Sequence, residues 1–241
     1  MKDGETKIYG KHACRAVFDK RPDDIIRVLL DQKSKPFFRE LLDHCVAQRK
    51  TYRVVSTEEL EKFSGARHHE GICIVTIPKW SRSIDQILAE DGAGLLLALD
   101  QVSNPHNIGT LLRTAAHFGA RAVLLSGKLR RLSAAAYRTS EGAAEHVDVV
   151  FEEEMSTLLQ ACKDAKFTVC ATSSHKGVSL YEQALPARAV ILLGAERDGL
   201  SKTLMSEADK LISIPGTEKV ESLNVASSAA VFLAEHWRLH A

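Results

Sequence analysis

Polar side chains stand at three places where the surrounding apolar pattern does not require them. The first place is the segment 104–113, which reads NPHNIGTLLR and follows an apolar run. It holds Asn107, a candidate helix cap, and Arg113, six residues further along a helical pattern of Leu, Ala and Phe. Six residues do not share one helix face, so the two side chains need not point the same way. Taken alone, this segment equally fits a cap plus a surface arginine.

The second place is the segment 192–200, which reads LLGAERDGL. A glycine at a strand end, here Gly194, lets a ligand approach the backbone closely. Glu196 then lies at the carboxyl edge of the sheet, where open α/β sheets bind ligands. The spacing is neither Gly-x-Gly-x-x-Gly nor a Gly-Lys-Ser/Thr phosphate loop, so it does not indicate NAD or ATP. An ordinary turn built on two glycines remains the alternative.

The third place begins with IPG at 214–216 and continues with EKVESLNVA at 218–226. Ser222 and Asn224 precede a long apolar helical pattern, where free backbone N–H groups gather. Plain capping by either residue is the alternative. Since each of the three segments follows a predicted strand, all three can meet at one edge of one sheet.

The elements that position these segments alternate between strand and helix. The uninterrupted apolar run 95–99 is typical of a strand buried on both faces of a parallel sheet. The alternation predicts a mainly parallel sheet flanked by helices, an α/β fold. Further strands are predicted at 122–125, 147–151, 167–171, 189–193 and 211–214, and helices at 107–118, 155–165, 201–208 and 223–239.

The first part of the chain reads as a separate, small α/β unit of about 80 residues. The segment PKWSRS at 78–83 breaks its pattern and precedes a short predicted helix, 84–89. We therefore expect a domain over 1–78, a linker over 79–91 and a second domain over 92–241. In the first domain we expect helices at 10–19, 36–48 and 57–63, the last capped by Thr57, and strands at 25–30, 52–55 and 71–77.

Composition is that of a globular protein, with 45% hydrophobic and 26% charged residues among 241. No apolar run approaches the roughly 18 to 20 residues of a membrane helix, and the first residues lack the apolar core of a signal peptide. We expect a cytoplasmic protein. Five cysteines, without Cys-x-x-Cys spacing, are expected to be reduced, with Cys73 and Cys170 in the core. His68 and His69 are expected on a loop surface.

The net charge of +1 gives no support for nucleic-acid binding by itself. Its distribution is more informative, because residues 1–80 hold 16 Lys+Arg against 12 Asp+Glu, a surplus of +4. A second group of cations consists of Lys128, Arg130, Arg131 and, beyond them, Arg138. Phosphate binding needs clustered cations more than a high global charge. On charge alone, a solvated surface is the favoured interpretation.

Together the three segments are far more specific than any one of them. Asn-x-Gly-x-x-x-Arg, Gly-x-Glu-x-x-Gly and Ile-Pro-Gly followed by Ser-Leu-Asn-Val-Ala resemble, in order and spacing, the signature motifs of the SpoU branch of the SPOUT methyltransferases. The segment 138–146, RTSEGAAEH, resembles another family segment. This resemblance covers about 92–241. Residues 8–77, with YGKHA at 9–13 and HEG at 69–71, resemble the L30e-like substrate-binding domain of several rRNA-modifying members.

The resemblance implies a trefoil-knotted catalytic domain that binds S-adenosyl-L-methionine and methylates a ribose 2′-hydroxyl of RNA, rRNA in preference to tRNA. It implies catalytic or positioning roles for Arg113, Asn107, Glu196, Ser222 and Asn224. It implies a homodimer, with no metal, membrane or DNA. A catalytically inactive RNA-binding or ribosome-assembly factor is the alternative, and the retained polar residues favour the enzyme. By the same resemblance the cofactor contacts are Thr172, Gly194, Ile214 and Leu223.

Overall fold

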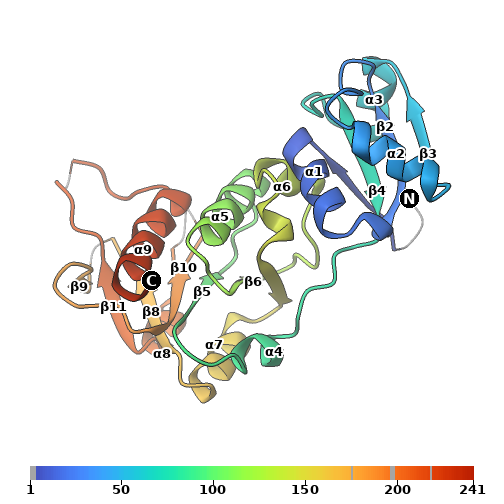
Figure 1. Ribbon diagram of the computed structural model, residues 1–241. Helices are drawn as coiled ribbons and strands as arrows, with labels where there is room; N and C mark the ends of the chain where they lie inside the picture. The colour runs from blue at the N-terminus through green and yellow to red at the C-terminus, as the bar shows by residue number, and fades with distance from the viewer. Residues whose placement is uncertain (1–3, 175, 196–198, 218) are drawn as a thin grey trace. The chain divides into compact units, whose positions relative to one another are not determined.

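The computed structural model describes residues 4–174, 176–195, 199–217 and 219–241 (Figure 1). The chain divides into two compact units. The first unit comprises Met1–Trp80 and Leu132–His146, and the second comprises Ser81–Arg131 and Val147–Ala241. The segment 132–146 lies within the sequence range expected for the second domain, yet it packs with the first unit. The backbone therefore passes from one unit to the other three times.

The first unit contains a four-stranded mixed sheet in the order β1-β4-β2-β3. β4 pairs antiparallel with both β1 and β2, whereas β2 pairs parallel with the edge strand β3. In chain order the elements are β1 (Thr6–Tyr9), α1 (Lys11–Lys20), η1 (Pro22–Asp24), β2 (Ile25–Leu30), α2 (Arg39–Ala47), β3 (Thr51–Val54), α3 (Thr57–Ser64), β4 (Ile72–Thr76), α6 (Ala134–Thr139) and η2 (Ala143–Glu145).

The segment 132–146 completes the core of the first unit. Ala134 of α6 packs against a buried cluster that includes Tyr9 and Leu60. Glu145, whose side chain is only 1% exposed, forms a two-pronged ion pair with Arg21 at 2.9 and 3.0 Å. Burial raises the pKa of the neighbouring Tyr137 to about 12, which keeps its phenol neutral.

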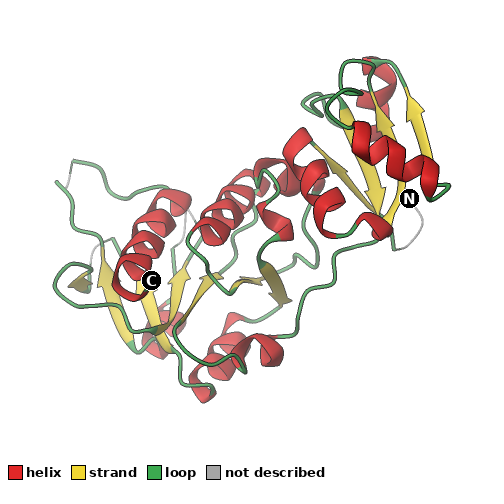
Figure 2. Cartoon of the chain, in the orientation of Figure 1, coloured by secondary structure: helices red, strands yellow, loops and turns green. Residues whose placement is uncertain are grey.

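The second unit contains a seven-stranded sheet in the order β7-β6-β5-β10-β8-β11-β9, and all its strand pairings are parallel (Figure 2). This confirms the predicted α/β class. The elements are α4 (Ile84–Leu88), β5 (Gly94–Leu99), α5 (Pro105–His117), β6 (Ala122–Ser126), β7 (Asp148–Glu152), α7 (Met155–Asp164), β8 (Thr168–Thr172), β9 (Val178–Ser179), β10 (Arg188–Leu193), α8 (Lys202–Glu207), β11 (Lys210–Ser213) and α9 (Val225–His240).

Helices cover both faces of this parallel sheet. Figure 1 shows α5 and α9 side by side on one face and α4, α7 and α8 on the other. The central strands β5, β6 and β10 are buried almost throughout, which is why they read as continuous apolar runs. Burying branched and long aliphatic side chains on both faces supplies the main driving force for this unit. The predicted trefoil knot stays a prediction.

Three helix starts differ from or refine the expected caps. Asn104, not Asn107, caps α5, because its Oδ1 accepts the N–H of His106 at 2.9 Å. Ser56, not Thr57, caps α3. Asn224 caps α9, accepting the N–H of Ala226 at 2.8 Å. The side-chain oxygens of these residues satisfy backbone donors that a helix start leaves unpaired.

The expected linker, 79–91, is largely fixed to the second unit. Ser83 and Gln86 form a reciprocal capping box at the start of α4, which buries Ile87 and Leu88 in the core. Arg121 and Arg188 donate to carbonyl groups of the following loop, among them Glu90 O at 2.7 and 2.8 Å. These hydrogen bonds order the approach to β5, so the segment 81–93 is a structured part of the second unit.

Two expectations about single residue types have clear outcomes. All five cysteines are buried free thiols, and burial raises the pKa of Cys73 to about 12 and that of Cys170 to about 11, which confirms their assignment to the core. The expectation of a surface position for His69 is wrong, because it is only 4% exposed, whereas His68 is exposed. Within the described part of the chain, no helix is long and apolar enough to span a bilayer.

Candidate functional site

The carboxyl ends of neighbouring strands bring the three polar segments to one edge of the parallel sheet. β5, β10, β8 and β11 are consecutive in the sheet and end at Leu99, Leu193, Thr172 and Ser213. Adjacent strands lie about 4.8 Å apart. The first segment follows β5, the second follows β10 and the third follows β11. The topology therefore collects all three segments where α/β sheets place ligands.

The first segment enters α5 immediately after this edge. Asn107 lies half-buried in the first turns of the helix, and Arg113 is exposed further along it. Six residues of α-helix separate the two side chains by about 9 Å along the axis and about 120° around it. The structure thus confirms that they occupy different faces. Asn107 is half-buried, and Arg113 is exposed.

The second segment follows β10, and its Gly199 lies against Ala195. The Gly199 N–H donates to the Ala195 carbonyl at 2.9 Å, and these two residues form an isolated antiparallel bridge. A Cβ on Gly194 would lie 2.3 Å from the carbonyl carbon of Gly199, so only glycine fits beneath this turn. Glu196 lies outside the described residues. On the neighbouring strand, the Thr172 hydroxyl donates to the Leu192 carbonyl at 3.1 Å.

The third segment combines apolar side chains with open backbone. Ile214 is half-buried, while Leu223 is 48% exposed at the start of α9. A Cβ on Gly216 would meet nothing within 4 Å, so the backbone there faces open space. Ser222 is exposed. Asn224 uses its carbonyl oxygen to cap α9, which leaves its NH₂ group as the donor for a ligand.

Two buried polar residues, Asp100 and Ser126, interact at the ends of their strands. They were not predicted from the sequence. The Ser126 hydroxyl, at the end of β6, donates to Asp100 Oδ1 at 2.6 Å. The Asp100 N–H donates to the Leu193 carbonyl at 2.8 Å, which ties the end of β5 to that of β10. The signal in the sequence was an acidic residue directly after the apolar run 95–99. This network fixes the strand ends from which the first two segments depart.

The chemistry of this edge fits a cofactor held by backbone groups and apolar contacts. Ile214 and Leu223 offer apolar surface on the loop between β11 and α9, and Gly216 leaves the backbone accessible beside them. A nucleoside has a flat ring that packs on aliphatic side chains and edge atoms that bind backbone groups. Within the described residues, no group of three or more His, Cys, Asp or Glu is arranged to hold a metal ion.

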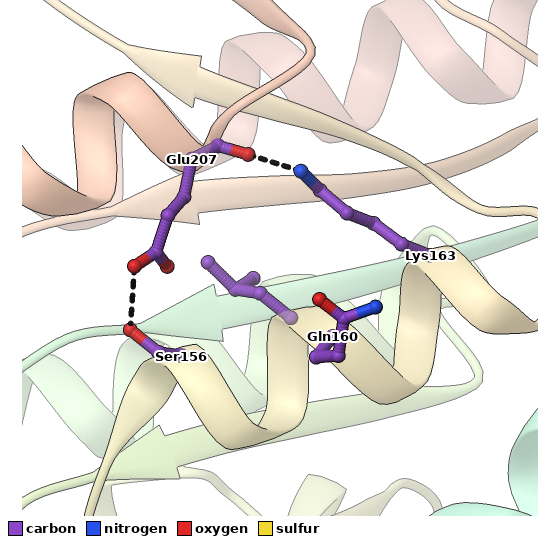
Figure 3. Close-up of a pocket in the computed structure, with 5 residues that line it drawn as sticks. Ser156, Gln160, Lys163 and Glu207 are labelled. Atoms are coloured by element: carbon purple, nitrogen blue, oxygen red, sulfur yellow. Dashed lines mark hydrogen bonds between the residues drawn. The ribbon is translucent and has the colours of Figure 1, made fainter.

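A cavity of about 190 Å³ lies elsewhere, between α7 and α8 (Figure 3). Its polar groups are already paired within the protein. Ser156 Oγ donates to Glu207 Oε1 at 3.1 Å, while Lys163 Nζ donates to the Glu207 carbonyl and forms an ion pair with Asp209 at 3.4 Å. These contacts hold α7 and α8 together. The cavity therefore has a structural explanation and is separate from the strand edge.

Comparisons with known proteins agree with this arrangement. Residues 94–234 match the model of the SpoU rRNA Methylase family, and residues 7–79 match the model "RNA 2'-O ribose methyltransferase substrate binding". The chain is 39% identical over 235 residues to the "Uncharacterized tRNA/rRNA methyltransferase YfiF" of Escherichia coli, covering 97% of this chain and 68% of that protein. A relative from Haemophilus influenzae, 30% identical, is covered over 66% of its length.

Two further relatives cover nearly the whole chain. The "23S rRNA (guanosine-2'-O-)-methyltransferase RlmB" of Vibrio vulnificus is 32% identical over 237 residues, covering 95% of this chain and 94% of that protein. The fold resembles that of the SpoU methyltransferase AviRb from Streptomyces viridochromogenes, with a TM-score of 0.83, 20% identity and coverage of 98% and 90%. With both family models matched in order along the sequence, the chain belongs to the SpoU rRNA methylase family.

Proposed function

We propose that this protein transfers the methyl group of S-adenosyl-L-methionine to a ribose 2′-hydroxyl of ribosomal RNA. The observation that carries the proposal is the convergence of the three motif segments at the adjacent ends of β5, β10 and β11. The relatives named for 23S rRNA (guanosine-2'-O-) methylation, which match the chain over almost their full length, favour rRNA over tRNA.

The cofactor site is formed by the loops after β10, β8 and β11. Bound there, S-adenosyl-L-methionine supplies a methyl group on a sulfonium. Ile214 and Leu223 would pack against its adenosyl part, and Gly194, closely packed at the end of β10, would lie beside it. The Thr172 hydroxyl donates its proton to the Leu192 carbonyl, so towards a ligand its oxygen can only accept a hydrogen bond.

Arg113 stabilises the negative charge that develops on the ribose 2′-oxygen and binds the adjacent phosphate. Its guanidinium is accessible and carries a planar array of donors that suits phosphate and ribose together. Arginine stays protonated in proteins, so we assign it charge stabilisation rather than proton removal. Such an interaction is strongest in the transition state and therefore acts on turnover.

Four other polar residues position the reacting groups. Asn107 lies half-buried near the start of α5, while Ser222 is exposed and Asn224 presents its NH₂ group at the start of α9. We assign these three, with Glu196, to holding Arg113, the ribose and the cofactor. The first unit, which matches the substrate-binding model, supplies RNA affinity, and the second unit supplies the chemistry.

A methyl-transfer assay tests the proposal. The purified full chain, with radiolabelled S-adenosyl-L-methionine, is given rRNA and tRNA from cells that lack the corresponding gene, and the modified nucleotide is mapped. We expect label in rRNA at a ribose 2′-oxygen. Label in tRNA alone would reject the rRNA assignment. Tight RNA binding without any methyl transfer would instead identify a binding-only factor.

We also propose that the protein acts as a homodimer, with the exposed part of α9 in the contact between the two copies. Phe232 and Leu233 of α9 are buried within the second unit and so do not provide a contact surface. Trp237, on the same helix, is 54% exposed. A second copy of the chain that packs against α9 would cover this apolar surface and remove it from water. Light scattering at micromolar concentration should report twice the monomer mass, and Trp237→Ser should lower it; a wild-type monomer would reject the dimer.

A further inference from the structure

In the first unit, the exposed ring of Phe37 lies where α1 and the loops 31–38 and 67–71 meet, with the ammonium group of Lys11 near it. Phe37 is 47% exposed, and its ring packs edge-on against the buried Phe38 with centroids 4.8 Å apart. Lys11 Nζ lies 5.9 Å from the Phe37 ring centroid. Phe38 therefore holds the Phe37 ring in place, and Lys11 adds positive charge at its face.

The loops around this ring are fixed by buried and charge-assisted hydrogen bonds. In the loop 67–71, the Glu70 carboxylate accepts the Lys11 backbone N–H at 2.9 Å and so caps α1, which has no side-chain cap of its own. Arg138 Nη2 donates to the same carboxylate at 2.8 Å, and Arg138 Nε donates to the His68 carbonyl at 2.9 Å. Glu70 holds a left-handed backbone conformation, φ 56°.

The loop 31–38 is bound to this junction in turn. The Asp31 N–H donates to the Gly71 carbonyl at 2.9 Å, and a Cβ on Gly71 would lie 2.1 Å from Ser34 Oγ. His69 accepts the Gly71 N–H through Nδ1 at 3.0 Å. Its Nε2, which must then carry the proton, is buried without a partner. Strained backbone and an unpaired buried polar group are features that persist where a site, rather than stability alone, shapes the structure.

Exposed cations border this junction. Lys33 is exposed on the loop 31–38, and Arg67, which also forms an ion pair with Glu61 at 3.3 Å, is exposed on the loop 67–71. A flat ring held in place by Phe38, with the Lys11 ammonium group at its face and further cations on the adjoining loops, matches the two binding groups of a single-stranded nucleotide, the base face and the phosphate. A paired and stacked base offers no free face to such a ring.

We propose that this surface, the Phe37 platform (Lys11, Phe37 and the loops 31–38 and 67–71), stacks an unpaired base of the substrate RNA. The inference rests on the proposed function, because it takes RNA as the substrate. It adds that the first unit recognises a looped or bulged nucleotide rather than a duplex. Arg138 and Glu70 are positioning residues that fix the platform without touching the base.

The direct test is RNA binding by the full chain, measured by fluorescence anisotropy at fixed salt. The probes are a labelled oligouridylate, which is largely unstacked, and an RNA duplex of the same length. We expect Phe37→Ala to weaken oligouridylate binding about tenfold or more, as for other base–aromatic stacks, and to leave duplex binding unchanged. Phe37→Leu keeps apolar packing but removes the flat ring, so it should weaken binding as well, which covers the case of an unstable alanine variant.

Matched controls come from the same unit. Tyr52, on β3, is another exposed aromatic at 39%, and Tyr52→Ala should leave oligouridylate binding unchanged. Lys11→Gln should weaken binding, whereas Lys20→Gln, at the other end of α1, should not. The platform is rejected if Phe37→Leu binds oligouridylate as tightly as the wild type, or if Tyr52→Ala weakens binding equally.

The failure of the platform and the failure of the proposed function give different results. Methyl transfer to RNA with an unchanged KM in Phe37→Ala and Phe37→Leu would reject the platform and leave the enzyme assignment standing. Absence of methyl transfer by the wild-type protein, together with Phe37-dependent oligouridylate binding, would reject the enzyme assignment and leave the platform standing. If the platform is correct, the Phe37 variants raise the KM for RNA and leave kcat at saturating RNA nearly unchanged.

Discussion

The two sheets of this protein gather their functional residues in different ways. In the second unit, the strands are parallel, and the ends of β5, β10 and β11 each deliver one polar segment to the same edge of the sheet; β5 and β10 are buried almost throughout. In the first unit, the sheet is mixed, and its edge strand β3 is exposed along its whole length. Its candidate RNA surface lies on loops that side-chain contacts, chiefly those of Glu70 and Arg138, hold together.

The two units differ in which substitutions leave the functional site intact. At a parallel sheet edge the backbone topology fixes the positions, so a substitution there affects chemistry more than geometry. In the first unit, the positions of the loops depend on a few ion pairs and on α6, a helix from a separate part of the sequence. Substitutions in the two units should therefore separate effects on turnover from effects on folding and RNA affinity.

The largest effect is expected at the edge of the second unit. Arg113→Ala should lower kcat about a thousandfold, near 4 kcal/mol of transition-state stabilisation, with little change in thermal stability because the side chain is exposed. Arg113→Lys should also be severely impaired, since it keeps the charge but loses the planar donor array. Single-turnover methyl transfer measures both variants, and Lys202→Ala, an exposed cation on α8, is the control. Near-normal turnover in Arg113→Lys would show that a point charge is sufficient.

The next largest effect is expected on the folding of the first unit. Arg21→Ala removes the partner of the buried Glu145 carboxylate and should lower the free energy of unfolding by about 3 kcal/mol. Arg15→Ala breaks exposed ion pairs and a contact with the Phe18 ring and should cost less than about 1 kcal/mol. Urea unfolding measures both, and calorimetry with S-adenosylhomocysteine should show an intact cofactor site in each. Equal costs for the two variants would contradict the structural role given to 132–146.

A smaller effect is expected at the turn after β10. Gly194→Ala places a Cβ against the backbone of Gly199 and should cost about 1 to 3 kcal/mol through overpacking, with a matching loss of S-adenosylhomocysteine affinity in calorimetry. At Gly216 a Cβ meets open space, so Gly216→Ala should leave the melting temperature unchanged. If Gly194→Ala neither melts earlier nor binds the ligand more weakly, the turn is more adaptable than its packing indicates.

The smallest expected effect is a dependence of the stability of the second unit on pH. Burial, with the nearby His240, lowers the pKa of His236, whose Nε2 lies 3.3 Å from the Ala187 carbonyl. The unfolded chain therefore binds a proton more readily than the folded chain, and stability should fall as the pH drops below about 6.5. His236→Gln should flatten this dependence in thermal melts from pH 8 to pH 5, whereas His117→Gln, exposed on α5, should not. An unchanged slope in His236→Gln would assign the dependence to other groups.

The sequence predicted the second sheet well because buried parallel strands have a distinct local pattern. The apolar runs at 95–99 and 189–193 and the alternation with helices defined all its strands except the two-residue β9. β1 was missed since it spans only four residues, two of them polar. At the edge, the motifs located the segments, but their detailed roles depended on hydrogen bonds. Asn104 and Ser56 cap where Asn107 and Thr57 were expected, because caps are decided by backbone conformation.

Local sequence patterns could not predict contacts between residues that are distant in the sequence. Nothing in the segment 132–146 itself indicates that it completes the core of a unit whose other residues end at Trp80. His69 was expected on a surface because polar residues beside a strand usually lie there, yet it is buried and accepts the Gly71 N–H. Buried pairs such as Asp100 with Ser126 likewise join residues that are distant in sequence.

The separation of Trp80 from Leu132 in sequence also sets an order of events during synthesis. Domains near the N-terminus commonly fold while the rest of the chain is still being made. Here the first unit lacks α6 and the Glu145 partner of Arg21 until residues up to His146 have left the ribosome, by which time β5, β6 and α5 of the second unit have emerged as well. A stalled chain ending near Trp80 should therefore remain sensitive to protease, and one extended well beyond His146 should not.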